Sequence, residues 1–237
     1  MQLKLFLLLL FLILTTSCNV EDLVGELGSS KIKAKDKVGE VLNKAKAEFS
    51  PDAKLSGIFG REVSTDGTIN LLDTQSLSMF FYAAQSDSMQ QNKIYIPVYK
   101  SSPVESPIDF QTTLDFVQDE NVKNFMSLIL GKISTLSIDP GVNYANSDAV
   151  LQTMFNNSNV NDFRTINPET KIDMYLVPSK SIDSTFSNSA DWIVNFYTTS
   201  ESLVMWLHTA TGGVQQLQAP QKSLPDYFYT SFLRNFN

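Results

Sequence analysis

The chain has 237 residues, of which 43% are hydrophobic and 11% aromatic, and its formal net charge is −7. This length suffices for one large domain or two small ones, and the aromatic content predicts a packed core and not a disordered stalk. Because the chain is acidic and has no stripe of lysine and arginine to neutralise phosphates, we expect no nucleic-acid partner.

The start of the chain, residues 1–17, predicts export. Lys4 precedes the apolar run Leu5–Leu14, and small polar residues lead from this run to Cys18, the single cysteine. A run of this length is typical of a secretory signal peptide and is too short for a membrane-spanning helix. Its end at a cysteine resembles bacterial lipoprotein signals, which implies cleavage between Ser17 and Cys18 and attachment of lipid to Cys18.

An ordinary signal peptide with an incidental cysteine is the alternative. Lipoprotein signals usually have Leu three residues before the cysteine, where this chain has Thr15. Lipidation accounts for the cysteine count, because a single thiol forms no internal disulfide and is open to oxidation in an exported protein. Asn19 follows the cysteine in place of the aspartate of inner-membrane lipoproteins. The resemblance therefore implies the bacterial outer membrane, on its periplasmic or its surface side.

Small, polar and charged residues at 18–35 predict a tether between this anchor and the folded body. The tether runs into the basic segment Lys31–Lys37, which reads KIKAKDK. We interpret this segment as a solvated linker that enters a helix. Contact with anionic lipid headgroups is the alternative, but so few charges attract a membrane only weakly at physiological salt.

A first folded unit is expected at residues 36–110. Apolar residues recur at helical spacing from Val38 to Phe49, and Pro51 ends this helix. Pro97 lies in the last strand-like run and donates no ladder hydrogen bond, which favours an edge strand or a bulge. The runs that predict strands in this unit are 54–63, 77–84 and 93–100.

A connector with a helix is expected next, at residues 111–145. Apolar side chains repeat at helical spacing from Val122 to Ile133, and Asp119 is suited to cap the start of this helix. We expect the connector helix to pack against the predicted sheets.

The second unit, at residues 146–218, repeats the order of the first, with a helix and then strands. Phe81-Tyr82 before Ser-Asp-Ser matches Phe196-Tyr197 before Ser-Glu-Ser, in the same place of this order. Chance similarity is the alternative. The expected elements are a helix at 147–155, strands at 171–177, 190–199 and 203–209, and an aromatic C-terminal tail at 219–237 that packs onto the body.

The segment Lys44–Gly60, followed by an Asp-Gly turn and an aromatic strand, resembles the PepSY-like domains of bacterial envelope proteins, and the second unit resembles another copy. This resemblance implies an α+β fold of two tandem helix-plus-antiparallel-sheet units, with the connector helix between them. It also implies a non-enzymatic role, such as inhibition or ligand binding.

The residues offer little for catalysis. His208 is the sole histidine, and Cys18 is committed to lipid, so no histidine or thiolate metal site is available. A Ser-His-Asp triad would need His208 and Asp191, but no nucleophile motif accompanies them, and we interpret His208 as a half-buried residue on a sheet face. We therefore expect a protein that is not an enzyme, with no catalytic residue, metal or cofactor.

Strand alternation predicts one candidate binding face, on the side of the sheet away from the helices. An amphipathic aromatic surface of this kind suits recognition of a protein or a small ligand. The alternative is that the connector or the tail covers this face as a second core layer. The residues expected on the face are Tyr175, Tyr197, Trp206 and His208.

These observations predict a lipid-anchored, non-catalytic binding module of the cell envelope, which recognises an envelope protein or a small ligand. The alternative function is a structural or scaffold subunit of an envelope assembly, docked through the aromatic tail at 219–237.

Overall fold

The structure, a computed structural model, describes residues 30–73, 78–106, 136–186 and 188–217, together with positions 120, 123, 124 and 127. Residues 1–30 and 31–237 form separate units, so the described part belongs almost entirely to the second. The predictions for the signal peptide, for Cys18, for most of the connector helix and for the C-terminal tail fall outside the described residues.

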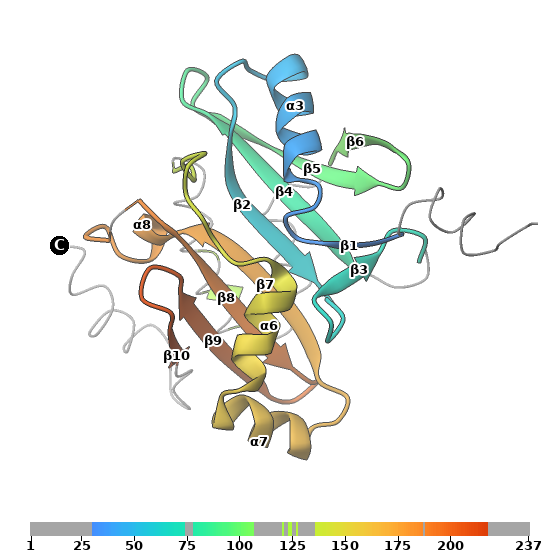
Figure 1. The fold of residues 1–237 in the computed structure, drawn as a ribbon, viewed down its shortest axis with the longest axis vertical. Helices are drawn as coiled ribbons and strands as arrows, with labels where there is room; N and C mark the ends of the chain where they lie inside the picture. Colours follow the sequence, from blue (N-terminus) through green and yellow to red (C-terminus); the bar gives the residue numbers. More distant parts are fainter. Residues whose placement is uncertain are drawn as a thin grey trace, which may run out of the picture. The chain divides into compact units, whose positions relative to one another are not determined.

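One antiparallel sheet of eight strands organises the body (Figure 1). Its strand order is β10-β9-β8-β7-β2-β4-β5-β6, so the first half of the chain builds one side of the sheet and the second half builds the other. A separate ribbon pairs β1 (Lys31–Lys33) with β3 (Thr68–Asn70). The strands of the large sheet are β2 (Lys54–Arg61), β4 (Met79–Ser86), β5 (Gln91–Val98), β6 (Ser101–Glu105), β7 (Lys171–Pro178), β8 (Ala190–Tyr197), β9 (Ser202–His208) and β10 (Gly213–Leu217).

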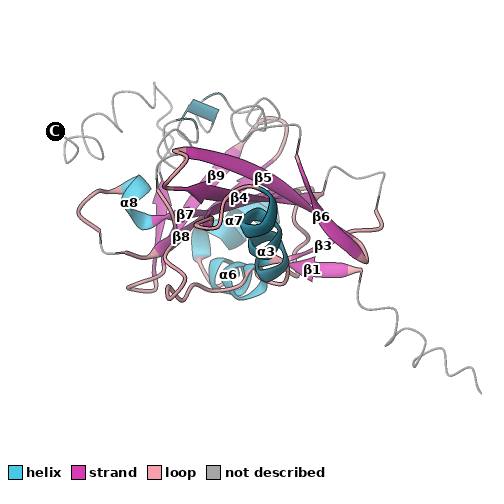
Figure 2. Cartoon of the chain, turned by 90° about the horizontal axis from the view of Figure 1, so that it is seen from above, coloured by secondary structure: helices cyan, strands magenta, loops and turns pink. Residues whose placement is uncertain are grey.

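Three helices cover one face of this sheet, as Figure 2 shows. They form where apolar residues recur at helical spacing, for example Val41 and Ala45, or Val150 and Met154, all of which are buried. Asn146 caps the start of the second helix by accepting the Ser147 N–H over 2.9 Å. The helices are α3 (Val38–Glu48), α6 (Ser147–Phe155) and α7 (Ser158–Ile166), and a short α8 (Ser179–Ile182) follows β7.

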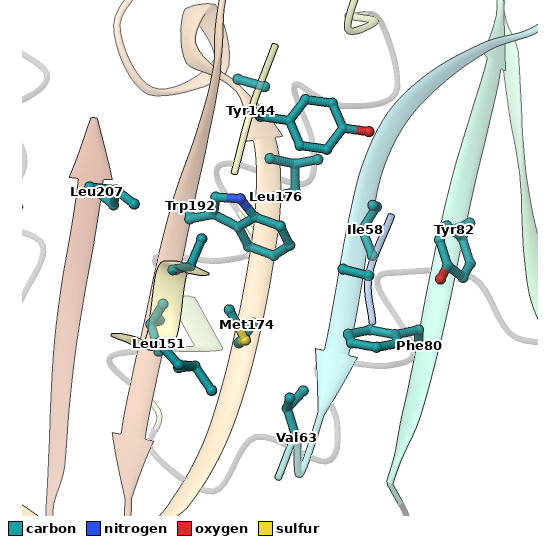
Figure 3. Packing of buried hydrophobic residues seen from close by; sticks show 14 of the residues in the cluster. Ile58, Val63, Phe80, Tyr82, Tyr144, Leu151, Met174, Leu176, Trp192 and Leu207 are labelled. Atoms are coloured by element: carbon teal, nitrogen blue, oxygen red, sulfur yellow. The ribbon is translucent and has the colours of Figure 1, made fainter. Parts of the chain in front are cut away.

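The helix-side core fills the space between these helices and the sheet (Figure 3). Trp192 on β8 is fully buried there, and its Nε1–H donates to the Ala145 carbonyl over 3.0 Å. Because side chains alternate along a strand, Val194 also faces the helices while Ile193 faces away. Tyr197 lies on the same side as Ile193, away from the helices, as strand alternation predicted.

The expected fold class is wrong in its main feature, because the two halves share one sheet. Strands β2 and β7 pair directly, with Phe59 opposite Tyr175, so no boundary separates two helix-plus-sheet units. The described residues are mostly β, with ten strands and four short helices. The physical reason is that an unpaired edge on either strand would leave backbone N–H and C=O groups without partners, and joining the two edges satisfies both.

The short sequence repeat does not mark equivalent positions. Phe81 on β4 faces away from the helices and Tyr82 faces them, whereas on β8 Phe196 faces the helices. Tyr197 then points to the opposite side, where its hydroxyl contacts Asp173. An offset of one residue reverses every side chain of a strand, so the match of letters carries no common packing role.

Pro97 lies at a bulge, which was one of the two predicted possibilities. The register between β5 and β6 shifts between Ile96 and Val98, on either side of this proline. Strand β5 is not the edge of the sheet, since β6 pairs with it. The bulge lets the strand continue where proline supplies no donor.

Candidate functional site

The residues of the predicted binding face lie on the same side of the sheet, but they do not form one continuous surface. Tyr197 at the end of β8 lies opposite Lys171, at the start of β7. Asp191, which holds His208, lies opposite Val177 near the other end of the same strand pair. The structure therefore separates Tyr197 from His208 along the length of the sheet.

The centre of this face is core. Tyr175 is 2% exposed and Trp206 is 5% exposed, and the Tyr175 ring stacks on Phe59 with a centroid distance of 4.8 Å. We call this group the second layer; its buried members are Phe59, Phe81, Ala83, Ile94, Tyr175, Val177, Ile182, Ile193, Val204 and Trp206. Tyr175 and Trp206 are therefore core residues, and they form no open aromatic surface at the centre of the face.

At one end of the face, His208 and Asp191 form a hydrogen-bonded pair. The Asp191 carboxylate is fully buried and lies 2.9 Å from His208 Nδ1. It also accepts the Trp206 indole N–H over 3.1 Å and the Thr209 backbone N–H over 3.0 Å. Three donors satisfy the carboxylate, and the pair fastens β8 to the end of β9.

The chemistry open to this pair is restricted. In catalytic triads and metal sites, a carboxylate accepts a hydrogen bond from Nδ1 of a histidine, and the other ring nitrogen, Nε2, accepts a proton or binds the metal. Among the described residues, Asp191 is the hydrogen-bond partner of the His208 ring, and no group of three histidine, cysteine, aspartate or glutamate residues could hold a metal. Phe186 covers the imidazole at a centroid distance of 4.8 Å. The contacts of the pair therefore join β8, β9 and the turn after β9.

At the other end of the face, beside Tyr197, lies a pocket of about 560 Å³. It opens where β2 ends, β7 begins and β8 ends, and Ile166, the last residue of α7, lines it. The loop after α7 and the turn after β8 complete its walls. Its lining residues are Arg61, Glu62, Ile166, Asn167, Pro168, Glu169, Lys171, Tyr197, Thr198, Thr199 and Ser200.

Asp173 on β7 joins two walls of the pocket from behind. Its Oδ1 accepts the Glu62 backbone N–H over 2.9 Å and the Tyr197 hydroxyl over 3.3 Å. The side chain lies on the central strand, so it reaches β2 on one side and β8 on the other. One buried carboxyl group therefore fixes the relative positions of Glu62 and Tyr197.

Burial controls the protonation of this group. Asp173 is 4% exposed, and desolvation raises its pKa to about 7, against the lowering effects of the Glu62 N–H, the Arg61 guanidinium and the Tyr197 hydroxyl. Burial and the neighbouring Asp173 also raise the pKa of Tyr197, so its phenol stays protonated. Tyr197 thus keeps a hydrogen to donate to Asp173.

Glu62 adopts an uncommon backbone conformation at the pocket. Its φ is 44°, in the left-handed region that few non-glycine residues occupy. The Glu62 N–H is held by Asp173, its carbonyl accepts the Ser78 hydroxyl over 2.9 Å, and its side chain binds Lys171 Nζ over 2.9 Å. Such strain persists where surrounding contacts over-determine the backbone, and it is enriched at functional sites.

Two buried polar atoms beside Asp173 have no hydrogen-bond partner among the described residues. They are Asn195 Oδ1 and the Tyr175 hydroxyl. Asn195 lies directly opposite Asp173 in the β7–β8 register, and Tyr175 is the next residue of β7 on the same face. The second layer is therefore polar where it approaches the pocket.

The lysines of the basic segment Lys31–Lys37 make contacts within the body. Lys31 lies 3.5 Å from Asp66, and Lys33 pairs with Asp148. The other two bind the Tyr144 carbonyl and Glu40. These contacts disfavour the alternative of a headgroup-binding patch, and the segment starts the fold as β1.

Sequence reasoning placed Tyr197 on an aromatic face and not in a pocket, and it gave no role to Arg61, Glu62 or Lys171. Each lies at a strand end, and only the β2–β7 pairing brings these ends together. The sequence contained one indication of this site, which is Asp173, a carboxylate within the mainly apolar strand β7. Carboxylates are rarely buried unless they have partners, so such a residue indicates a polar site nearby.

Fold and site together define a β-rich protein in which helices back one sheet face and a polar pocket opens at one end. No family model, no curated protein and no solved structure matches this chain. None of the helices in the described part of the chain combines the length and the apolar character that crossing a membrane requires.

Proposed function

We propose that this chain is a lipid-anchored, non-catalytic binding module of the bacterial outer membrane, and that it holds a small polar ligand in the pocket beside Tyr197. The signal sequence that ends at Cys18 supports the anchor. The observation that carries the binding role is the pocket, whose two walls are fixed by one buried carboxyl group on the strand between them.

The volume of the pocket and the hydrogen bonds that hold its walls in place favour ligand binding. A volume of about 560 Å³ falls in the range of small-molecule sites. Walls held in place before the ligand arrives reduce the entropy cost of binding. A protein partner is less well supported, because the aromatic surface expected to bind it is buried at its centre.

The contacts around the pocket favour binding over catalysis. The Glu62 carboxylate is engaged by Lys171, and the buried Asp173 carboxyl group, which accepts the Tyr197 hydroxyl, also holds the Glu62 backbone N–H. The sole histidine lies at the other end of the sheet face. Burial raises the pKa of Tyr197, so its hydroxyl stays protonated, and these contacts favour a positioning role for Asp173 and Tyr197 over nucleophilic catalysis.

A tryptophan placed at the pocket mouth tests the proposal. Thr199 is exposed on the pocket rim, so Thr199→Trp should fill the mouth and leave the core unchanged. The matched control is Ala210→Trp, which places the same side chain on the exposed turn at the other end of β9. The measurement is thermal unfolding with a library of amino acids, dicarboxylates, nucleosides and saccharides, in a detergent without a sugar headgroup.

We expect at least one compound to stabilise the wild type and Ala210→Trp but not Thr199→Trp. A ligand at a hundred times its Kd adds about 2.7 kcal/mol of stability, which is easily measured. A library without any stabilising compound, or one whose active compounds also stabilise Thr199→Trp, would contradict a ligand site at this pocket.

A further inference from the structure

We infer that the pocket takes a neutral, polyhydroxylated ligand of the size of a mono- or disaccharide, whose hydroxyl groups are recognised by Tyr197, Glu62 and Lys171. The inference rests on the proposed function, because it names the ligand class of the same pocket.

The charged side chains that line the pocket balance one another, which favours a neutral ligand. Two cationic side chains, Arg61 and Lys171, line the pocket together with two anionic ones, Glu62 and Glu169. Glu62 Oε1 lies 2.9 Å from Lys171 Nζ and 3.9 Å from Arg61 Nη2, so opposite charges already compensate each other. An anionic ligand would meet the carboxylates and a cationic ligand would meet the guanidinium and the ammonium. A neutral ligand avoids both penalties.

The pocket offers both hydrogen-bond donors and hydrogen-bond acceptors to a ligand. The Tyr197 hydroxyl directs its hydrogen to Asp173, so its oxygen presents lone pairs to a ligand. Lys171 has N–H donors beyond the one used by Glu62, and a carboxylate accepts several bonds at once. A sugar hydroxyl both donates and accepts, so adjacent hydroxyls can satisfy donors and acceptors that alternate around one pocket.

The pocket also offers apolar surface at its rim. Ile166, the last residue of α7, is 75% exposed, and Pro168 and the Tyr197 ring line the same pocket. These three residues give a polar cavity an apolar rim, and ligand pockets combine apolar walls with a few polar groups. The C–H face of a sugar ring would cover Ile166 and would therefore account for its exposure.

Binding of neutral and charged sugars to the full-length chain tests the ligand class directly. The probes are D-glucose, D-galactose, N-acetyl-D-glucosamine and maltose, with D-glucuronate and D-glucosamine as charged counterparts. Calorimetry and saturation-transfer NMR at pH 7.5, again without a sugar-based detergent, give the affinities. We expect at least one neutral sugar to bind at least about tenfold more tightly than either charged counterpart, since like-charge contacts are costly.

Two variants test the recognition contacts. Tyr197→Phe removes the acceptor oxygen and should weaken sugar binding about five- to tenfold, as loss of one hydrogen bond does. Tyr99→Phe makes the same change in the turn between β5 and β6, outside the pocket, and should leave the affinity unchanged. Asp173→Asn keeps an oxygen for the Glu62 N–H and should retain binding, whereas Asp173→Leu should abolish it.

The outcomes separate this inference from the proposed function. Tighter binding of glucuronate or glucosamine than of every neutral sugar, lost in Thr199→Trp, would overturn the ligand class and leave the pocket as a binding site. Binding of no sugar in the panel would overturn the ligand class as well. Equal effects of Tyr197→Phe and Tyr99→Phe, with wild-type folding of both, would overturn the assigned contacts.

Discussion

At the scale of single residues, the two aspartates on the outer side of β7 and β8 differ in how their charge is accommodated. Asp191 accepts hydrogen bonds from three groups and ties the sheet together. Asp173 accepts two bonds, and burial raises its pKa to about 7. The charge of Asp173 therefore responds to pH near neutrality.

This raised pKa predicts a pH-dependent stability. An unfolded aspartate titrates near 3.8 and folded Asp173 titrates near 7, so between these values the native state binds more protons than the unfolded state. The free energy of unfolding contributed by Asp173 is then largest below pH 3.8 and falls as the pH rises to 7. The full difference is on the order of 4 kcal/mol, at about 1.36 kcal/mol per unit of pKa.

The measurement is urea unfolding of the wild type and of Asp173→Asn between pH 4.5 and 8. We expect the free energy of unfolding of the wild type to decline relative to that of the variant as the pH rises. Carboxyl groups whose pKa is lowered, such as Asp148, act in the opposite direction at more acidic pH and are common to both proteins. Two parallel curves would show that Asp173 does not titrate in this range.

At the scale of elements, the close packing of β2 against β4 depends on a glycine. A Cβ atom built at Gly60 would lie 2.5 Å from the Phe80 ring and 2.7 Å from Val63. Gly39 on α3 has no such neighbour within 4 Å. The same substitution should therefore have opposite effects at these two positions.

Gly60→Ala should destabilise the protein by about 1–3 kcal/mol, because it overpacks the helix-side core. Gly39→Ala should stabilise it by about 0.5–1 kcal/mol, because alanine loses less backbone entropy in a helix. Denaturant unfolding at constant pH compares the two variants with the wild type. A neutral Gly60→Ala would mean that β2 and β4 lie further apart than described.

The sequence predicted individual elements well and their partners poorly. Helical spacing located α3 and α6, and strand patterns located β2, β4, β5, β7, β8 and β9, but not the shorter strands β1, β3, β6 and β10. These patterns are local properties of the chain. The β2–β7 pairing is not, because alternation fixes which face is buried but not which strand lies alongside.

The same limitation explains why most of the pocket was missed. Arg61, Lys171 and Tyr197 occupy ends of three strands that are distant in sequence, and only the order of strands makes them neighbours. Helix α7 was also missed, since its sequence is polar and buries Val160 alone. Tyr197 was predicted because an aromatic residue on the outer side of β8 can be read from the alternation.

At the scale of the whole molecule, the signal sequence predicts a lipid at Cys18. Cys18→Ala should abolish incorporation of an alkyne-labelled fatty acid and should leave the signal peptide attached. Ser17→Ala is the matched control, because lipoprotein signals commonly have alanine before the cysteine, and it should be labelled like the wild type. The measurements are the fatty-acid label on the isolated protein and its intact mass. An unlabelled wild type would mean that the signal peptide is of the ordinary secretory kind and that Cys18 carries no lipid.

The pairing of β2 with β7 also has a consequence for folding kinetics. Phe59 and Tyr175 are neighbours in the sheet, although about half of the chain lies between them. The loop that joins them must close before the centre of the sheet forms, and contacts of such large sequence separation slow folding. Until β7 emerges, the first half of the chain presents β2 as an open edge, which is the kind of surface that invites pairing with another chain. The signal sequence predicts export, and a chain exported from its N-terminus would be most exposed to misassembly during the interval between the arrival of these two strands.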